Sequence, residues 1–448
     1  MGTYSYKGIY TLTGTGRYEG TNRLGKSRSA RWLPTWNVAG AWNVHEEKFY
    51  SNFTNPVLSH ATLKASYSLT ADRGPAFVTN SQAILNSYSP WRPSASVTES
   101  GMRITELENS ELTYEKKHEF NVGADFGFID NRINLSLDYY TRNNYDLIGL
   151  INTQGGGGQG TKYANVASMK SSGIELTISS KNMKTKDFSW NTYFIFSKTK
   201  NEITDLKSHA NVLSLISGNG FGREGYPVRG LFSIPFAGLT EDGLPTFINQ
   251  DGQKTISSFN FQEYEKLDFL KYEGPTDPTI TGSFGNILTY KNLKLNVFVT
   301  YSFGNVIRLD PVFSNAYSDL DAMPKEFKNR WMKAGDENIT NIPTIVSTRM
   351  NQQYAYLNMA YNAYNYSDVR IADGGFIRLK EISLSYDLPV KVINFFRLNK
   401  LQLKLQATNL CLLYADSKLN GQDPEFFRSG GVSTPVPKQF TFTVRLGL

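Results

Sequence analysis

The last ten residues of the chain constrain its fold more than any other stretch. In the run 439–448, QFTFTVRLGL, apolar side chains occupy every second position, namely Phe440, Phe442, Val444, Leu446 and Leu448. Strict alternation with a period of two is typical of a β-strand whose two faces meet different surroundings. The run ends on an apolar residue of the same pattern, so we expect this strand to be built into a sheet.

The alternating pattern recurs along the whole chain. The clearest hairpin spans 117–142, where two alternating runs flank a short turn at Ile129-Asp130-Asn131. Aromatic residues make up 13% of the chain, which also favours strands over helices. In total the pattern predicts about 13 strands. The other predicted strands lie at 5–20, 31–44, 63–71, 173–181, 188–200, 279–290, 292–303, 376–389, 401–412 and 439–448.

The turns favour one class of β-protein. No run of about 18 or more apolar residues occurs, so we expect no transmembrane helix. A transmembrane β-barrel fits, because its strands alternate lipid-facing apolar residues with lumen-facing polar residues. Predicted turns alternate between short ones, near 130, 184 and 291, and long ones. Outer-membrane barrels have short turns on one side and long loops on the other, and a soluble sandwich has no reason for this alternation.

Charge and cysteine content exclude several functions. The net charge is +7, but Lys and Arg are scattered rather than clustered, which argues against nucleic-acid binding. The single cysteine, Cys411, excludes an internal disulfide. No secretory signal begins at Met1, so we expect either an intracellular protein or a chain whose N-terminal part is missing from this sequence.

The sequence contains no pattern for catalysis, a metal or a cofactor. The four histidines, His45, His60, His118 and His209, have no metal-ligand spacing. The motifs at 242–243 and 249–252 resemble parts of a calcium loop, but Asx-Gly turns are the favoured interpretation. Acidic residues on the strands alternate with apolar ones, which indicates a lumen lining rather than a catalytic pair. We therefore expect no enzyme activity.

Aromatic residues in the predicted loops are the candidate contact sites. Their rings are suited to stacking on sugars or to packing against a partner protein. The alternative is that they form an interfacial girdle or pack within their own loops. These residues are Tyr88, Trp91, Tyr354, Tyr356, Tyr361, Tyr364 and Tyr366.

Seven blocks spread over nearly the whole chain stand out as recognisable motifs. The blocks are NVAGAWNVHEEKF (37–49), YEKKHEFNVGADFGFIDNRINLSLDYYTRNNYDLI (114–148), NVASMKSSGIELTI (165–178), EGYPVRGLFSIPFAGL (224–239), GPTDPTITGSFGNILTYKNLKL (274–295), FIRLKEISLSYDLP (376–389) and QDPEF (422–426). Together they resemble the SusC/RagA family of TonB-dependent outer-membrane transporters. No block is diagnostic alone, but their number and order make the match strong.

This resemblance implies an all-β fold, a transmembrane antiparallel β-barrel. Members of the family have a plugged barrel of about 22 strands, so the chain is expected to supply about 13 C-terminal strands without the plug. The whole of 1–448 is then one partial barrel domain. Its long loops are expected near 72–113, 145–168, 240–278, 305–375 and 413–437.

The resemblance also implies nutrient import across the outer membrane. The implied cargo is glycan oligosaccharides or peptides, and the implied partners are a SusD-like lipoprotein, outer-membrane lipid and the TonB–ExbB–ExbD complex, which acts through the missing N-terminal region. Two alternatives stay open. One is a TonB-dependent receptor for siderophores or cobalamin, which the absence of a neighbouring SusD-like gene would favour. The other is a soluble, secreted β-rich carbohydrate-binding protein or glycosidase, which would be extracted without detergent.

Overall fold

The fold consists mainly of strands. The computed structural model describes residues 1–51, 57–75, 78, 82–91, 99–155, 160–218, 220–312, 325–354, 356–395, 398–428, 431–432 and 437–447. Within these ranges no helix is both long and apolar enough to cross a membrane.

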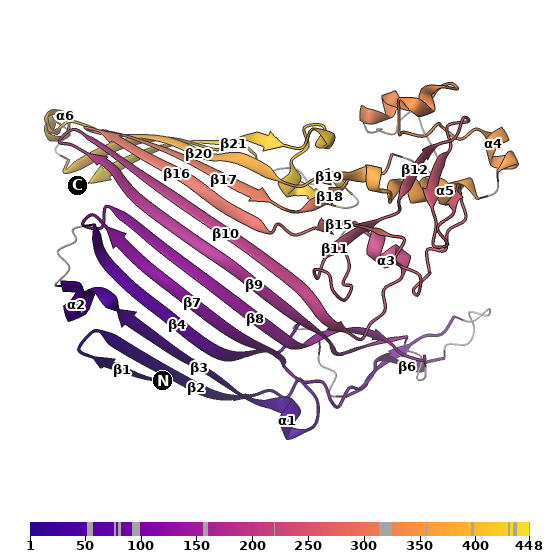
Figure 1. The fold of residues 1–448 in the computed structure, drawn as a ribbon, viewed down its shortest axis with the longest axis horizontal. Helices are drawn as coiled ribbons and strands as arrows, with labels where there is room; N and C mark the ends of the chain where they lie inside the picture. The colour runs from indigo at the N-terminus through magenta and orange to yellow at the C-terminus, as the bar shows by residue number, and fades with distance from the viewer. Residues whose placement is uncertain are drawn as a thin grey trace. The chain divides into compact units, whose positions relative to one another are not determined.

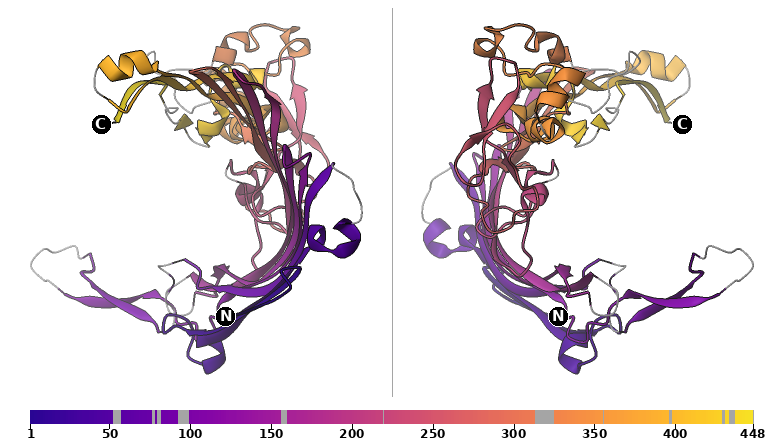
Figure 2. Two further views of the ribbon diagram at one scale, coloured as in Figure 1. Left: turned by 90° about the vertical axis from the view of Figure 1, so that its left-hand side faces the viewer. Right: turned by 90° about the vertical axis from the view of Figure 1, so that its right-hand side faces the viewer.

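Thirteen strands of the described residues form one sheet, in which neighbours in the strand order are hydrogen-bonded. Figure 1 labels these strands, and Figure 2 shows the same ribbon from two further sides. The spatial order follows the chain, and the predicted number of strands is confirmed. The predicted strand at 5–20 is wrong in one respect: it is a hairpin of two strands, because Lys7 and Gly8 adopt positive φ and reverse the chain. The strands are β1 (Gly2–Tyr6), β2 (Tyr10–Gly20), β3 (Trp32–Asn43), β4 (Leu58–Asp72), β7 (Glu115–Phe128), β8 (Ile133–Asn152), β9 (Thr161–Lys184), β10 (Phe188–Leu206), β16 (Ile280–Tyr290), β17 (Leu293–Phe303), β20 (Phe376–Asp387), β21 (Lys400–Ala415) and β24 (Gln439–Gly447).

The chain divides into two compact units. Unit 1 comprises 1–176, 199–209 and 224–226, and unit 2 comprises 177–198, 210–223 and 227–448. In unit 1 the register of β1, β2, β3, β4, β7 and β8 gives the sheet two different faces. One face carries the row Tyr4, Leu12, Gly40, Ala65, Val122 and Tyr139. The opposite face carries the row Ser5, Thr11, Ala41, Lys64, Gly123 and Asp138.

Unit 2 shows the same separation across β10, β16, β17, β20, β21 and β24. One row is entirely apolar: Trp190, Leu288, Leu295, Leu384, Leu405 and Phe442. The neighbouring row on the other face is mostly polar: Asn191, Ile287, Asn296, Ser383, Gln406 and Thr441. The apolar side chains of β24 are 48–77% exposed, which is the pattern of a lipid-facing surface. Leu448 lies outside the described residues.

Short and long connections alternate, as predicted. The turn between β7 and β8 is tight because Ile129, Asp130 and Asn131 all have φ between 51° and 57°. Even shorter turns join β9 to β10 and β16 to β17. In unit 2, α6 (Val390–Phe395) lies at the short-turn end of the strands, whereas α4 (Thr348–Gln353) and α5 (Leu357–Asn365) lie at the other end (Figure 1).

The predicted loop at 145–168 is wrong, because most of it is strand. Strand β8 continues to Asn152 and β9 begins at Thr161, which leaves only 153–160 between them. The strand ends stay regular because they pack on other residues. Ile148 and Tyr163 contact a buried cluster of Leu24, Val78, Leu112 and Tyr114. Within the predicted loop at 72–113, β5 (Ile84–Tyr88) and β6 (Gly101–Glu106) form a hairpin.

The predicted loop at 305–375 contains a small core. One face of α5 packs Leu357, Ala360 and Tyr361 against Leu244, and these four side chains are at most 2% exposed. A 3-10 helix, η2 (Lys325–Asn329), also lies in this stretch. Other elements of this stretch are β18 (Val306–Arg308), η3 (Asp336–Asn338), η4 (Asp368–Arg370) and β19 (Ile371–Asp373).

The remaining elements are short. Those at 240–278 and just before it are α3 (Val212–Ile216), β11 (Gly230–Ser233), β12 (Phe236–Leu239), β13 (Pro245–Ile248), β14 (Lys254–Thr255) and β15 (Lys271–Pro275). Those at 413–437 are η5 (Ser417–Leu419), η6 (Pro424–Phe426), β22 (Phe427–Arg428) and β23 (Gly431–Val432). Near the N-terminus lie α1 (Arg28–Arg31), η1 (Val44–Glu46) and α2 (Lys48–Ser51).

Candidate functional site

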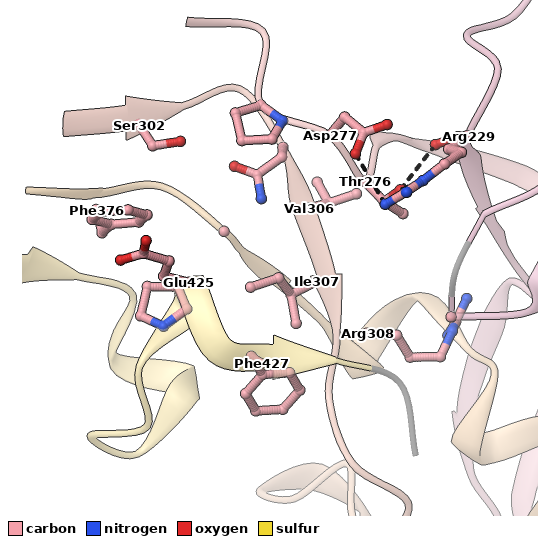
Figure 3. Close-up of a pocket in the computed structure, with 15 residues that line it drawn as sticks. Arg229, Thr276, Asp277, Ser302, Val306, Ile307, Arg308, Phe376, Glu425 and Phe427 are labelled. Atoms are coloured by element: carbon pink, nitrogen blue, oxygen red, sulfur yellow. Dashed lines mark hydrogen bonds and ion pairs between the residues drawn. The ribbon is translucent and has the colours of Figure 1, made fainter. Parts of the chain in front are cut away.

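A polar cavity of about 480 Å³ lies among the loop segments of unit 2, and we name it the loop pocket (Figure 3). Segments from six parts of the sequence build it, including the end of β17, the beginning of β20, all of β18 and the beginning of η6. Its lining residues are Gly218, Arg229, Thr276, Asp277, Pro278, Ser302, Asn305, Val306, Ile307, Arg308, Gly374, Phe376, Pro424, Glu425 and Phe427.

One side of the loop pocket carries a pair of opposite charges. The Nη2 atom of Arg229 lies 2.9 Å from Oδ1 of Asp277, and its Nε–H donates to Oγ1 of Thr276 at 3.3 Å (Figure 3). About half of each charged side chain is exposed, 53% for Arg229 and 54% for Asp277. Because so exposed an ion pair contributes little to stability, both groups can exchange their mutual contact for a ligand.

The opposite side is held by an arginine of the sheet. Arg378, on β20, is 5% exposed and donates from Nη2 to both carboxylate oxygens of Asp423, at 2.5 and 2.6 Å. The same nitrogen lies 3.1 Å from Oε2 of Glu425. Asp423 Oδ1 also accepts the backbone N–H of Glu425 at 3.1 Å, which caps η6. Arg378 therefore fixes the segment 423–427 where it lines the pocket.

The wall between these two sides contains a buried amide. Asn305 is 9% exposed, and its Oδ1 atom has no hydrogen-bond partner among the described residues. Gly374 approaches this amide so closely that an added Cβ would lie 2.2 Å from Nδ2 of Asn305. A buried acceptor without a partner is rare in folded proteins, so Asn305 is suited to accept a hydrogen bond from a ligand.

A second buried arginine, Arg308, is itself part of the pocket lining. Arg308 is 7% exposed, and its guanidinium donates to Phe232 O at 2.6 Å, to Ser233 Oγ at 3.1 Å and to Ser367 O at 3.2 Å. Burial lowers the pKa of Arg308 to about 10, so the side chain stays charged at neutral pH. Nearby, burial also raises the pKa of Glu273, whose carboxylate lies 3.5 Å from Lys271 Nζ.

The seven aromatic residues predicted as contacts do not line the loop pocket. Tyr361 and Tyr364 are each 1% exposed, so both rings are buried and the surface contacts predicted for them are not available. Tyr361 donates to Thr344 O at 2.7 Å. Tyr364 packs edge-on against Phe236, and burial raises the pKa of Tyr364 to about 12. Both rings therefore pack against the segment 236–244 rather than on the surface.

The other five aromatic residues are more accessible. Tyr88 and Trp91, in unit 1, are 41% and 86% exposed. In unit 2, Tyr356 is 71% exposed, whereas Tyr354 donates to Asp242 Oδ2 at 3.0 Å, a bond that raises the pKa of Tyr354. The ring of Tyr366 lies beside Arg308, at 5.6 Å from its guanidinium carbon.

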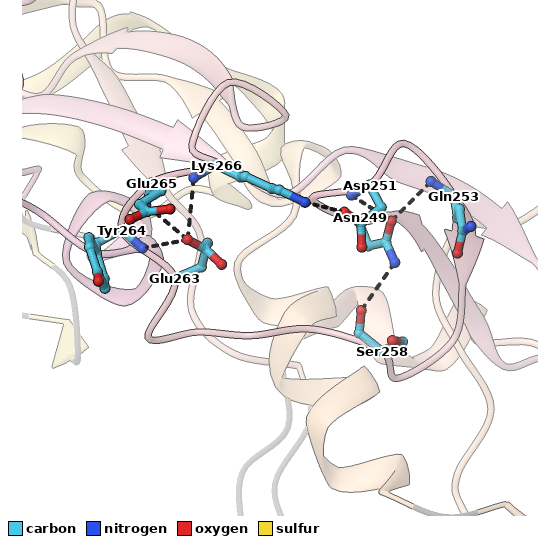
Figure 4. A network of polar contacts seen from close by, with 8 residues as sticks. All are labelled: Asn249, Asp251, Gln253, Ser258, Glu263, Tyr264, Glu265 and Lys266. Atoms are coloured by element: carbon cyan, nitrogen blue, oxygen red, sulfur yellow. Dashed lines mark hydrogen bonds and ion pairs between the residues drawn. The ribbon is translucent and has the colours of Figure 1, made fainter.

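The apparent calcium motif is an Asx turn, as favoured from the sequence. The Oδ1 atom of Asn249 accepts the backbone N–H groups of Asp251 at 3.0 Å and Gln253 at 2.9 Å (Figure 4). Asp251 itself is paired with Lys266 at 2.8 Å. The local charges and amides therefore satisfy one another without a cation.

The histidines are closer together than their sequence spacing suggests. The rings of His45 and His60 lie 4.2 Å apart between centroids, whereas His118 packs on Tyr67. No group of three or more possible metal ligands occurs among the described residues.

The sequence interpretation missed the residues of the loop pocket. Thr276 and Asp277 lie in the block GPTDPTITGSFGNILTYKNLKL, and Glu425 lies in QDPEF. Both blocks served to recognise the resemblance, so a signal was present. What the linear sequence lacks is the tertiary contact, through Arg378, that brings QDPEF to the sheet.

Together these features define a class of protein. A sheet of long strands with one exposed apolar face and one polar face, joined by alternating short and long connections, is a wall of a transmembrane β-barrel. A family model described as "TonB dependent receptor-like, beta-barrel" matches residues 1–410, and the chain belongs to this family. The predicted outer-membrane location is confirmed by this family membership.

Relatives support the same identification. TonB-dependent receptor P3 of Formosa agariphila is 25% identical over 445 residues, which cover 94% of this chain and 41% of the relative. TonB-dependent receptor SusC of Bacteroides thetaiotaomicron is 26% identical over 478 residues, which cover 99% of this chain and 42% of the relative. The solved structure of the RagAB peptide transporter matches with a TM-score of 0.78 at 23% identity, covering 99% of this chain and 46% of that chain.

The resemblance predicted from sequence blocks is thus confirmed. The likeness to RagAB shows the fold, and the curated relatives are named as receptors rather than enzymes. The chain spans less than half the length of these relatives.

Proposed function

We propose that this chain forms part of the barrel wall of a longer outer-membrane importer for oligomeric nutrients. The observation that carries the proposal is the two-faced sheet, whose apolar rows suit lipid while its polar rows suit a water-filled lumen. The family match and the curated relatives, which are named TonB-dependent receptors, support it. Transport is a property of the full protein, to which this segment contributes wall and loops.

The proposed cargo is a glycan oligosaccharide or a peptide. Such oligomers present many hydrogen-bonding groups and little concentrated charge. The loop pocket offers a matching surface: the guanidinium groups of Arg229 and Arg308, the carboxylates of Asp277 and Glu425, the free acceptor of Asn305 and the hydroxyl of Ser302. Mixed donors and acceptors of this kind fix the orientation of a polar ligand. The name of the RagAB relative states that it transports peptides, which supports the peptide option.

Two partners are part of the proposal. The resemblance to SusC/RagA proteins supports a SusD-like lipoprotein on the outside and TonB–ExbB–ExbD as the source of energy. In the region that the structure describes, the exposed rings of Tyr88, Trp91 and Tyr356 are the proposed surface contacts for ligand or lipoprotein.

The test is uptake by cells that express the full-length gene in place of a deleted copy. Fluorescently labelled oligosaccharides and peptides are supplied, and accumulation is compared between Arg229→Ala and Arg17→Ala. Arg17 is the matched control, since it forms an ion pair with Glu19 at 2.6 Å, is 72% exposed and lies outside the pocket. We expect Arg229→Ala to reduce uptake at least tenfold while Arg17→Ala leaves it unchanged.

Equal uptake by both variants would contradict the role of the loop pocket. The proposed cargo would be contradicted if the deletion strain grew normally on every glycan and peptide but no longer grew on ferric chelates or cobalamin.

A further inference from the structure

An apolar groove of about 530 Å³ crosses the exposed face of unit 1 over β1, β2, β3, β4 and β7, and we name it the outer groove. Two cross-strand rows form it. The first row contains Leu12, Gly40, Ala65 and Val122, and the second contains Tyr10, Trp42 and Leu63. The opposite face at the same positions is polar, so the groove opens on the side of the sheet that faces lipid.

The groove exists because two small residues interrupt a row of large ones. Leu12 and Val122 stand at its sides and are 56% and 42% exposed. Between them, Gly40 and Ala65 form the floor. A Cβ added to Gly40 would meet no other atom within 4 Å, so open space lies directly above the backbone.

One end of the groove is polar and lies near the short turns. The rings of Tyr10 and Trp42 stack with centroids 6.3 Å apart. Glu47 accepts hydrogen bonds from the hydroxyl of Tyr10 and from Nε1 of Trp42. Lys7, in the β1–β2 turn, places Nζ 5.1 Å from the centre of the Tyr6 ring. The outer groove is therefore lined by apolar side chains and aromatic rings, and one carboxylate and one cation lie next to its end.

No charge is left inside the trough itself. Lys64 is the charged residue in its lining, and its Nζ lies 2.6 Å from Asp125 Oδ2. Asp125 lies in a cross-strand row with Thr62 and Ser136. Each residue of this row is two positions along its strand from the polar row that contains Lys64 and Asp138, and residues two positions apart point to the same face. The ion pair therefore belongs to the polar face. The lining that remains suits a hydrocarbon chain rather than a peptide or a sugar.

We propose that the outer groove binds one acyl chain of a phospholipid, with the phosphate near Lys7. Short turns of outer-membrane barrels lie on the periplasmic side, so the rim of the groove meets the inner leaflet, where the lipid is a phospholipid. Tyr and Trp at the rim match the interfacial position of a headgroup. The inference depends on the membrane location of the sheet and not on what the protein imports.

The test uses full-length protein extracted from membranes in mild detergent. Native mass spectrometry counts retained lipids for wild type, Gly40→Ile and Gly14→Ile. The Gly40 variant fills the floor of the groove without meeting another atom at Cβ. Gly14 is the matched control, because it also has no atom within 4 Å of an added Cβ but does not line the groove. We expect Gly40→Ile to lower phospholipid occupancy at least tenfold and Gly14→Ile to leave it unchanged.

A second measurement does not depend on a variant. A phosphatidylethanolamine with a photoreactive group in mid-chain is incorporated into vesicles with the wild-type protein and activated by light. We expect the label on peptides that contain Leu12 or Ala65. The proposal would be overturned if the label spread evenly over the apolar face, or if all three proteins retained the same amount of lipid. It would also be overturned if lipid A were retained in place of phospholipid, or if the protein formed a dimer that Gly40→Ile abolishes.

Discussion

Asn in place of Asp423 is the substitution that tests most sharply how the loop pocket is held together. Asp423 and Arg378 have side chains that are only 9% and 6% exposed, and two contacts of 2.5 and 2.6 Å join them. Asn keeps the size of Asp and an oxygen that can cap η6, but it removes the negative charge. The perturbation therefore leaves a buried guanidinium without its main anion.

The stability lost in Asp423→Asn follows from the burial of the ion pair. Removing one partner of a buried ion pair typically destabilises by about 3–5 kcal/mol. Glu425 lies 3.1 Å from the same Arg378 nitrogen and is partly exposed, so it replaces some of the lost charge. We therefore expect a destabilisation at the lower end of this range, about 3 kcal/mol. At 1.36 kcal/mol per tenfold, this corresponds to roughly a 150-fold increase in the population in which the segment 423–427 is open.

Hydrogen exchange followed by mass spectrometry measures this population in the full-length protein. The reporter amide is Phe426 N–H, which donates to Asp423 O at 3.1 Å. We expect its exchange to accelerate roughly 150-fold in Asp423→Asn, as derived from the buried-pair penalty. The double variant Arg378→Met with Asp423→Leu removes both charges, so it should exchange within about tenfold of wild type.

The control is an ion pair of similar length at the surface. Lys266 and Asp251 lie 2.8 Å apart, with side chains 64% and 48% exposed. Lys266→Ala should change local exchange by less than about fivefold, because such pairs contribute at most about 1 kcal/mol. The reasoning is refuted if Asp423→Asn changes exchange no more than Lys266→Ala does.

Three further predictions concern the sheet, a buried acid and the Asx turn. Gly282→Ala should lower the free energy of unfolding of the full protein by about 1–3 kcal/mol, because the added Cβ would lie 2.2 Å from Ile195 O. Gly14→Ala is the control, since open space surrounds its Cβ, and it should leave the stability unchanged. Equal melting temperatures of the two variants would contradict this prediction. Burial raises the pKa of Glu273 in the folded state above 4.5, so the folded state binds this proton more tightly than the unfolded state does. The stability of the protein should therefore fall as the pH rises from the unfolded-state pKa to the folded-state pKa. Over that pH interval the melting temperature of Glu273→Gln should fall less than that of wild type. Calcium or a chelator should leave the melting temperature unchanged, because Asn249 Oδ1 already accepts two backbone N–H groups of the loop 249–253. A calcium-dependent shift of the melting temperature that Asn249→Ala abolishes would refute the Asx-turn interpretation.

The main sheet was predictable because its signal is local. In β24 and in the β7–β8 hairpin, neighbouring residues alternate between two surroundings, and the alternation is written in the sequence itself. The extension of β8 to Asn152 was missed, because the end of that strand is fixed by packing on the cluster around Leu112 and not by alternation.

The loop regions were harder to predict for the same reason. Tyr361 and Tyr364 occur in a stretch rich in Asn and Tyr, which reads as a polar loop, yet both rings lie in the interior because α5 turns them toward Leu244 and Phe236. The loop pocket joins segments that are about 200 residues apart in the chain, from Gly218 to Phe427. Only tertiary structure brings Asp423 to Arg378.

The most direct test of the central claim is the accessibility of the two faces of the sheet in a membrane. A nitroxide is placed in turn at Leu405, Gln406, Thr441 and Phe442 of the full-length protein, in a Cys411→Ser background that removes its exposed thiol. Paramagnetic resonance then compares collisions with oxygen, which concentrates in lipid, and with a water-soluble nickel complex. We predict lipid exposure at Leu405 and Phe442 and water exposure at Gln406 and Thr441. Water exposure at all four positions would contradict it.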